Sequence, residues 1–267
     1  MTLTPSAQID RAASLLCDSR LKRHRFATFP SDCRPVDEFE AYATQESLHR
    51  KLTDQGWGHV VGHKIGCTTQ VMQAYLGIEN PCGGGVFDLT VQHEVGHFPI
   101  PHGLRVGVEC EIAVLIGTDL HAHEAPFGRD ELSAAVQGCL AAIEIVEDRY
   151  TNYQQLDTPT LIADDFFGAG CVLGGVDRGF SVLDLSAVTA QMSINGVEVG
   201  AGKGTDVLGD PLNALAWLAQ NLAERGQGLR RGEFVLLGSL VQTHWVQPGD
   251  QVFIRNDPLG AAQASFE

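Results

Sequence analysis

Three glutamates stand alone in otherwise apolar stretches of the sequence. Glu109 and Glu111 lie two residues apart in the run 106–116, and Glu144 lies in the run 141–146. Residues two apart in a β-strand face the same side, so Glu109 and Glu111 are predicted to point in one direction. Like charges in apolar surroundings are costly unless something positive lies between them. Three such carboxylates supply hard oxygen ligands, and the pattern predicts a site for Mg²⁺ or Mn²⁺ on Glu109, Glu111 and Glu144.

Each glutamate also has a simpler interpretation, as a solvated strand-edge residue or an ion-pair partner. Glutamate side chains are rarely fully buried, so this interpretation fits any one of them taken alone. Two separate apolar contexts, one around Glu109 and Glu111 and the other around Glu144, favour the metal site instead.

Other short motifs lack the structural context that their chemistry requires. His93 and His97 match the His-Glu-x-x-His pattern of zinc proteases, but that site needs a helix, and glycine and proline residues crowd this segment. The segment Gly202–Thr205 partly matches a phosphate-binding loop, yet the glycine required five residues earlier is Val197. No Gly-x-Ser-x-Gly motif surrounds Ser239, so a serine hydrolase is not indicated.

Composition and charge narrow the class of protein. The chain of 267 residues carries a formal net charge of −15, which would repel a phosphate backbone and argues against a nucleic-acid partner. Its seven cysteines are scattered without a Cys-x-x-Cys pair, which indicates neither a disulfide framework nor a zinc knuckle. The N-terminal residues lack the apolar stretch of a signal peptide, and no run approaches the roughly 20 apolar residues of a membrane span. We therefore expect a soluble, cytoplasmic protein with no membrane partner.

The predicted positions of the three glutamates require β-strands. The hydrophobic pattern predicts a β-rich body that follows a helical N-terminal part in the sequence. Short apolar runs separated by Gly and Pro dominate from about residue 86, whereas the first third of the chain opens with helical spacing. Strands do not alternate regularly with helices, so a doubly wound α/β sheet is disfavoured and an α+β fold is expected. We predict one structural unit, with a helical part over 1–60 packed on a β-rich catalytic body over 61–267.

Caps and turns locate individual elements. The pair Asp210-Pro211 is placed to begin a helix over 211–224, and Asn195-Gly196 is a strong hairpin signal. The run Gly83–Gly85 is interpreted as a flexible turn or a close backbone approach. Further helices are expected near the N-terminus, over 36–54 and over 129–140. Strands are expected over 59–65, 106–116, 142–146, 171–173, 187–194, 196–199, 234–240 and 251–254.

Several short motifs, each weak alone, follow one another in a fixed order from about residue 40 to the C-terminus. They are Gly62–Thr68, Val108–Ala113, Ala142–Val146 with Asp148–Tyr150, Ile162–Asp164, Gly202–Asp206, Leu208–Ala214, Leu237–Leu240 and Pro248–Asp250. This ordered series resembles that of the 2-keto-4-pentenoate hydratases. With the 2-oxohept-3-enedioate hydratases and the 4-oxalocrotonate decarboxylases, these enzymes belong to the fumarylacetoacetate hydrolase superfamily.

The resemblance implies a mixed-sheet β-roll of the fumarylacetoacetate hydrolase C-terminal type, a divalent metal on the three glutamates and a homo-oligomer. It also implies a functional lysine at Lys64, which binds the substrate carboxylate or moves a proton, with a pKa lowered by burial near the metal. Thr68 and Ser239 are expected to contact the substrate. The implied reaction is metal-dependent addition of water to a 2-hydroxypenta-2,4-dienoate-like acid, which gives a 4-hydroxy-2-oxo acid in the degradation of aromatic compounds.

The chain departs from the family pattern around Cys82 and at Asp165. Family members carry an acidic residue before an aromatic residue and a glycine where this chain has Pro81–Gly84, and an asparagine in place of Asp165. Both departures are expected where the substrate would be gripped. Three alternatives therefore stay open: decarboxylation of a 2-oxo-3-enedioate, C–C hydrolysis of an acylpyruvate, and a non-catalytic binding or scaffold protein that keeps the fold.

Overall fold

Two β-sheets form the body of the computed structural model, which describes residues 4–69, 73–74 and 78–267 of the chain. Within these residues the larger sheet has eight strands and the smaller sheet has five. Across the larger sheet the strands are β2 (Cys82–Phe87), β1 (Val60–Gly66), β10 (Phe234–Ser239), β5 (Arg105–Ile116), β6 (Val136–Asp148), β7 (Gly168–Leu173) and β3 (Val91–His93), with β11 (His244–Trp245) paired to β5. Across the smaller sheet they are β4 (Val95–Phe98), β13 (Gly260–Phe266), β12 (Gln251–Asp257), β8 (Thr189–Ile194) and β9 (Val197–Lys203).

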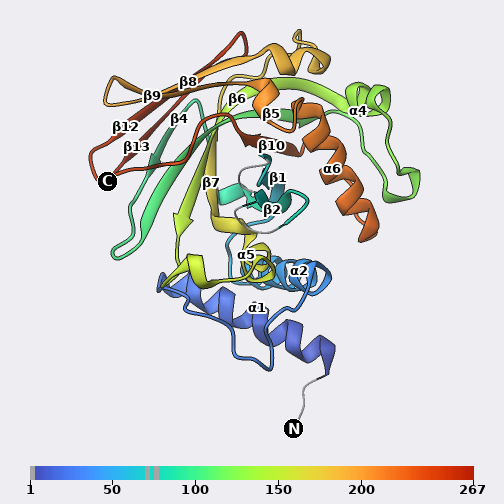
Figure 1. Ribbon diagram of the computed structural model, residues 1–267, viewed down its shortest axis with the longest axis vertical. Helices are drawn as coiled ribbons and strands as arrows, with labels where there is room; N and C mark the ends of the chain where they lie inside the picture. Colours follow the sequence, from blue (N-terminus) through green and yellow to red (C-terminus); the bar gives the residue numbers. More distant parts are fainter. Residues whose placement is uncertain (1–3, 70–72, 75–77) are drawn as a thin grey trace.

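Helices cover the sheets from two directions. The α-helices are α1 (Pro5–Lys22), α2 (Glu38–Asp54), α4 (Arg129–Ala135), α5 (Thr158–Ala163) and α6 (Pro211–Glu224). The 3₁₀ helices are η1 (Asp88–Thr90), η2 (Ala122–Glu124), η3 (Tyr153–Gln155), η4 (Asp165–Phe167), η5 (Val182–Ala187) and η6 (Gly204–Asp206). Figure 1 shows α1, α2 and α5 beneath the sheets and α6 beside them. Among the described residues, no helix is both long and apolar enough to span a membrane.

Capping and turn residues fix the ends of several elements. Asp37 accepts a hydrogen bond from a first-turn N–H of α2, and Asp210 does the same at the start of α6. Asn195 and Gly196 turn with positive φ between β8 and β9, as the hairpin signal predicted.

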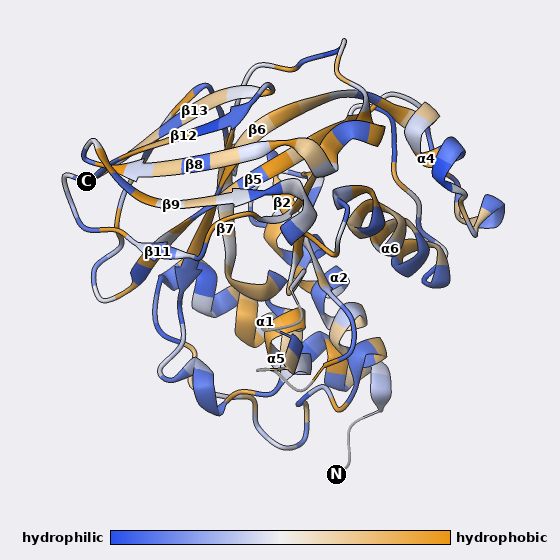
Figure 2. Cartoon of the chain, turned by 45° about the horizontal axis from the view of Figure 1, so that its top comes forward, coloured by the Kyte–Doolittle hydropathy of each residue, from blue (hydrophilic) through white to orange (hydrophobic). Residues whose placement is uncertain are grey.

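The larger apolar core lies between the two sheets and under α6. It takes alternate residues of β5, among them Val108, Cys110 and Ile112, together with buried residues of β6, β12 and α6. Figure 2 shows apolar residues of α6 on the side that faces the sheets. Because side chains alternate along a strand, Glu109 and Glu111 lie on the opposite face of β5 and point away from this core.

A second apolar core joins the N-terminal helices to the sheets. It contains Ala13 and Leu16 of α1, Leu48 of α2, Leu161 of α5 and Tyr150, which follows β6. The helical N-terminal residues therefore share buried surface with the rest of the chain, and the predicted boundary between residues 60 and 61 stays a prediction.

The α+β fold with mixed sheets is confirmed, because both sheets contain parallel and antiparallel pairs. The helix predicted over 211–224 matches α6, and the strand predicted over 106–116 matches β5 within one residue. His93 and His97 lie in β3 and β4, so the helix that a zinc-protease motif needs is absent there. The sequence patterns did not predict β3, β4, β11 or β13.

One predicted helix was too long, and of the two interpretations of Gly83–Gly85 the turn was wrong, whereas the close backbone approach is confirmed. The helix expected over 129–140 ends at Ala135, and β6 begins at Val136, because pairing with β5 along most of the strand outweighs the local helical pattern. The run Gly83–Gly85 is not a turn but lies in β2, a buried strand paired with β1. A Cβ at Gly85 would lie 2.6 Å from the His49 ring, so the missing side chains let α2 pack closely on β2.

Candidate metal centre

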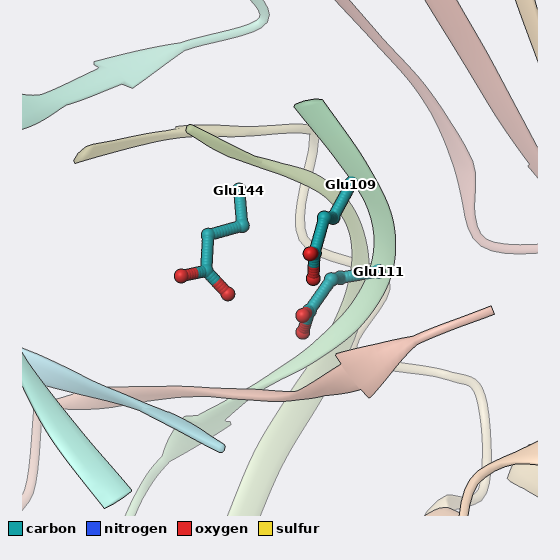
Figure 3. Close-up of side chains that lie close together, drawn as sticks. All are labelled: Glu109, Glu111 and Glu144. Carbon is teal, nitrogen blue, oxygen red and sulfur yellow. The ribbon is translucent and has the colours of Figure 1, made fainter. Parts of the chain in front are cut away.

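Two neighbouring antiparallel strands carry the three glutamates. β5 holds Glu109 and Glu111, and the strand register places Glu109 directly opposite Glu144 of β6. One carboxylate oxygen from each residue lies within 4.8 Å of the others. Figure 3 shows the three carboxyl groups extending into the same space beside the strands. Glu111 and Glu144 are 0% and 1% exposed and Glu109 is half-buried, so the fold brings together the residues that the sequence singled out.

Burial and mutual repulsion make the ionised cluster unfavourable for the protein chain by itself. Burial, followed by the charge of Glu144, raises the pKa of Glu109 to about 7. Burial and the two neighbouring glutamates raise the pKa of Glu111 well above its usual range. Within the described part of the chain, Glu111 Oε1 and Glu144 Oε2 accept no hydrogen bond, and Glu144 Oε1 has only its ion pair with Lys64. Unpartnered carboxylate oxygens at this spacing fit a hard divalent cation such as Mg²⁺ or Mn²⁺.

Lys64 reaches the cluster from β1, which β10 separates from β5. The Lys64 side chain is 3% exposed; its Nζ lies 3.1 Å from Glu144 Oε1 and donates a hydrogen bond to the Phe166 carbonyl oxygen at 2.8 Å. Burial alone would lower the pKa of Lys64, but the charges of Glu144 and then Glu109 outweigh burial and raise it. From the sequence we predicted a lowered pKa for Lys64 beside a bound metal. In the chain without a metal, the pKa of Lys64 is instead raised.

A cavity of about 590 Å³ opens beside Glu109 and Lys64. Thr68 and Ser239, the two residues predicted to contact substrate, both line this cavity. The Ser239 hydroxyl donates a hydrogen bond to the Val241 carbonyl oxygen at 2.6 Å, so its proton is already used within the chain. Thr68 is 4% exposed and forms part of the wall.

Sequence reasoning missed several residues of this site. Thr243 donates a hydrogen bond to Glu109, and the Gly238 N–H donates one to Glu111 at 2.8 Å. Four aromatic side chains also line the cavity, and they follow no strand or helix period in the sequence that could have marked them. They are Tyr153, Phe166, Phe167 and Trp245.

The two departures from the family pattern lie outside the cavity lining. Cys82 is buried at the start of β2, and neither Cys82 nor Asp165 is among the residues that line the cavity. Asp165 Oδ2 lies 2.9 Å from the Arg20 guanidinium, and Asp165 Oδ1 lies 2.7 Å from His49 Nε2. The expectation that these positions grip the substrate was therefore wrong, because side chains of α1 and α2 hold the Asp165 carboxylate away from the cavity.

Comparisons with known proteins agree with this fold. The model of the fumarylacetoacetate (FAA) hydrolase C-terminal family matches residues 89–267. A 2-keto-4-pentenoate hydratase of Paraburkholderia phymatum is 31% identical over 259 residues, which cover 97% of each chain. A 4-oxalocrotonate decarboxylase of Pseudomonas putida is 29% identical over 259 residues, again 97% of each chain.

A solved structure is similar over the whole chain. It is the 4-oxalocrotonate decarboxylase from Pseudomonas putida G7, complexed with magnesium and adipate, with a TM-score of 0.90 and 28% identity. The match covers 100% of this chain and 99% of that chain. The resemblance seen in the ordered motifs is thereby confirmed: the chain belongs to the fumarylacetoacetate hydrolase family, in the branch that contains 2-keto-4-pentenoate hydratases and 4-oxalocrotonate decarboxylases.

Proposed function

We propose that the protein is a lyase that adds water to a 2-hydroxypenta-2,4-dienoate-like monocarboxylic acid, with Mg²⁺ or Mn²⁺ held by Glu109, Glu111 and Glu144. The observation that carries the proposal is the convergence of these three carboxylates beside Lys64. The hydratase relative that covers 97% of the chain supports the class of reaction.

A divalent cation accounts for three acids gathered in one place. It would neutralise the repulsion between Glu109 and Glu144 and occupy the oxygens that accept no hydrogen bond. When bound, the metal would supply the positive charge that stabilises negative charge developing on the substrate. The magnesium in the similar decarboxylase structure supports this choice of ion.

Lys64 is suited to hold the substrate carboxylate. An ammonium group has three N–H donors, and Lys64 directs its Nζ toward two neighbours, Glu144 and the Phe166 carbonyl. The Glu144 carboxylate and the Phe166 carbonyl oxygen both favour the charged ammonium, which suits Lys64 to pair with an anion. We therefore assign carboxylate binding, rather than base catalysis, to Lys64.

The lining of the cavity favours a substrate with one carboxylate. Among the described lining residues Lys64 is the one cation, and Asp206 adds a negative charge. The undescribed residues 70–72 and 75–77 contain no Lys, Arg or His. A second carboxylate buried against aromatic rings would lack a positive partner, which makes its desolvation costly. A substrate whose other end is a short apolar chain fits this aromatic lining without such a cost.

The proposed reaction balances with water as the single co-substrate. The dienol loses its O2–H proton and gains a proton at C5, which gives 2-oxopent-3-enoate. Water then adds across the C3=C4 bond: its hydroxyl bonds to C4 and its proton to C3, and the product is 4-hydroxy-2-oxopentanoate. Through these steps Lys64 neutralises the carboxylate, and the aromatic wall limits access of bulk water.

Decarboxylation of a 2-oxo-3-enedioate is the second candidate. A specific observation favours it, because the similar decarboxylase structure that spans this whole chain holds adipate, a dicarboxylate. The two candidates share the metal site and differ in whether the far end of the cavity accepts a second carboxylate.

Direct assay separates the candidates. Purified protein would be loaded with Mn²⁺ and offered a 2-hydroxypenta-2,4-dienoate, a 2-oxo-3-enedioate and an acylpyruvate, with diene absorbance, CO₂ and pyruvate followed in parallel. We expect loss of diene absorbance from the monocarboxylate, without CO₂ or pyruvate. CO₂ released faster from the dicarboxylate would establish the decarboxylase, and pyruvate from the acylpyruvate would establish a hydrolase.

Variants connect the activity to the proposed site. Glu109→Gln should abolish Mn²⁺ binding and turnover together, whereas Glu198→Gln, on the exposed side of β9, should leave both unchanged. A wild-type protein that does not bind Mn²⁺, or a Glu109→Gln variant with unaltered Mn²⁺ affinity, would instead favour a binding or scaffold protein.

The homo-oligomer and the cytoplasmic location stay predictions. Sedimentation of the purified protein tests the oligomeric state.

A further inference from the structure

A buried ion cluster links α1 to the segment that follows α5. The Arg20 guanidinium on α1 lies 2.6 Å from Asp164 Oδ1 and 2.9 Å from Asp165 Oδ2. The side chain of Arg20 is 3% exposed, and those of both aspartates are 1% exposed. Charged side chains buried to this degree are tolerated in a folded protein when they are paired. Removal of one partner leaves the others as uncompensated buried charges, which is strongly destabilising.

The backbone held by this cluster is strained. Asp165, Phe166 and Phe167 have φ of 53°, 48° and 69°, three consecutive non-glycine residues in the left-handed region. Such conformations are unfavourable for residues with a Cβ and persist where surrounding contacts fix them. Arg20 contacts the side chains at the start of this segment, immediately before Phe166.

The strained segment in turn contacts the proposed catalytic machinery. The Phe166 carbonyl oxygen accepts the hydrogen bond from Lys64 Nζ at 2.8 Å, and the Phe166 ring centroid lies 5.6 Å from the same nitrogen. Phe166 and Phe167 both line the cavity beside Glu109. The direction of the Lys64 ammonium therefore depends on a carbonyl whose orientation is set by an unfavourable backbone conformation.

Among the residues that the structure describes, the other side chains and N–H groups that contact this cluster each contact only one of the two aspartates. His49 Nε2 and the Gly85 N–H bond Asp165 Oδ1, while Arg149 and the Tyr150 hydroxyl contact Asp164 Oδ2. Arg20 differs because its one guanidinium bridges both aspartates.

We propose that Arg20 is a positioning residue: by clamping Asp164 and Asp165 it fixes the Phe166 carbonyl and thereby aims Lys64 at the substrate carboxylate. This inference rests on the proposed function, because it requires Lys64 to bind the substrate.

The test uses the full-length protein and two successive binding measurements by calorimetry. Mn²⁺ is titrated first, and oxalate, a small dicarboxylate that can engage both a metal and Lys64, is then titrated into the Mn²⁺-loaded protein. The variants are Arg20→Met, which removes the charge; Arg20→Lys, which restores a charge without the fork that spans two carboxylates; and Asp165→Asn, which weakens the clamp with little change in shape. Arg34→Met is the matched control, because Arg34 also pairs an aspartate, Asp157, but at an exposed site.

We expect Mn²⁺ affinity within twofold of wild type in all variants, since none touches the three glutamates. Oxalate affinity should fall at least fivefold in Arg20→Met, by an intermediate amount in Arg20→Lys and not at all in Arg34→Met. With substrate, the loss should appear in KM as well as kcat, because Lys64 contacts the bound acid. A residue that merely stabilises the fold would lower the thermal midpoint and leave oxalate affinity of the folded protein unchanged.

Several outcomes would overturn the inference. Unchanged oxalate affinity in folded Arg20→Met does so directly. If Arg20→Met does not fold, Asp165→Asn decides: oxalate affinity equal to wild type rejects the clamp, and a fall of severalfold supports it. A wild-type protein that binds no Mn²⁺ is a different failure, visible before any variant is made, and it removes the proposed function together with the inference.

Discussion

At the scale of single residues, Glu109 and Glu144 face each other across a pair of strands, with one carboxylate oxygen of each within 4.8 Å of the other. Like charges directly opposite each other on a sheet are destabilising, and burial increases the effect. The cost falls on the chain without a cation and disappears when a cation is bound. Stability and metal affinity should therefore respond in opposite directions when one carboxylate is neutralised.

Glu111→Gln separates the two properties. Glutamine in place of a buried acid that is costly to ionise should stabilise the metal-free protein by about 1 kcal/mol at pH 8, because the Gln oxygen can still accept the hydrogen bond from the Gly238 N–H. Mn²⁺ affinity should fall at least tenfold, because the side chain becomes a poorer ligand. Urea unfolding in the presence of a chelator and calorimetry with Mn²⁺ measure these effects. A variant that is less stable without metal would contradict the account of repulsion.

The raised pKa of Glu109 predicts how the metal-free protein responds to pH. Between the usual value of 4.5 and about 7, the folded protein keeps a proton on Glu109 that the unfolded chain has lost. Stability from this group is therefore present at low pH and decreases as the pH rises through about 7. At about 1.4 kcal/mol per pKa unit, the decrease is at most about 3.5 kcal/mol.

Urea unfolding in the presence of a chelator, between pH 5 and pH 8, checks this sign. Glu109→Gln should flatten the profile, and saturating Mn²⁺ should reverse it, because metal binding requires the ionised carboxylate. A wild-type profile that rises with pH in the absence of metal would count against the burial of an uncompensated Glu109.

At the scale of elements, β2 contains three consecutive glycines that other segments approach closely. A Cβ at Gly84 would lie 3.0 Å from the Asp165 carbonyl oxygen and 3.2 Å from its Cα. Strand β2 thus packs directly against the strained segment whose Phe166 carbonyl holds Lys64. Even a single methyl group at Gly84 should therefore displace this segment and, with it, the Phe166 carbonyl that holds Lys64.

Gly84→Ala should destabilise the protein by about 1–3 kcal/mol, through overpacking, and should lower turnover more than Mn²⁺ affinity. The matched control is Gly175→Ala, because a Cβ there would meet nothing within 4 Å. Thermal unfolding, calorimetry with Mn²⁺ and the diene assay distinguish the two variants. Equal activity in both would show that β2 does not constrain the segment at Asp165.

At the scale of the whole molecule, the N-terminal helices contribute apolar residues to a core shared with the body. Ala13 and Leu16 of α1 lie in the same cluster as Tyr150 and Leu161. Arg20 adds buried charges on the same helix. The predicted helical part over 1–60 therefore completes the body instead of being an accessory to it.

Deletion of residues 1–34 tests this dependence. The truncated chain should lose its cooperative urea transition, because apolar surface and the Asp164 and Asp165 carboxylates would be uncovered together. Arg34→Met in the full chain, which removes an exposed pair, should shift the transition by less than about 1 kcal/mol. A truncated chain that unfolds cooperatively and still binds Mn²⁺ would show that residues 35–267 fold without α1.

Local patterns in the sequence determined the elements that carry most of the site. Alternation along 106–116 identified the strand and the common face of Glu109 and Glu111, because strand side chains repeat every two residues. Capping at Asp210 located α6 for a similarly local reason. The ordered motifs identified the family, since each keeps its chemistry within a few neighbouring residues.

Only the tertiary structure decided how these elements meet. The pairing of Glu109 with Glu144, the approach of Lys64 across β10, and the reversal of 136–140 from helix to strand all depend on contacts between distant segments. The clamp of Arg20 on Asp164 and Asp165 joins residues more than 140 positions apart. Hydrophobic period and propensity report the preference of a segment by itself. Register, ion pairing across the chain and strain in the loop at Phe166 arise when segments pack together, so no local pattern encodes them.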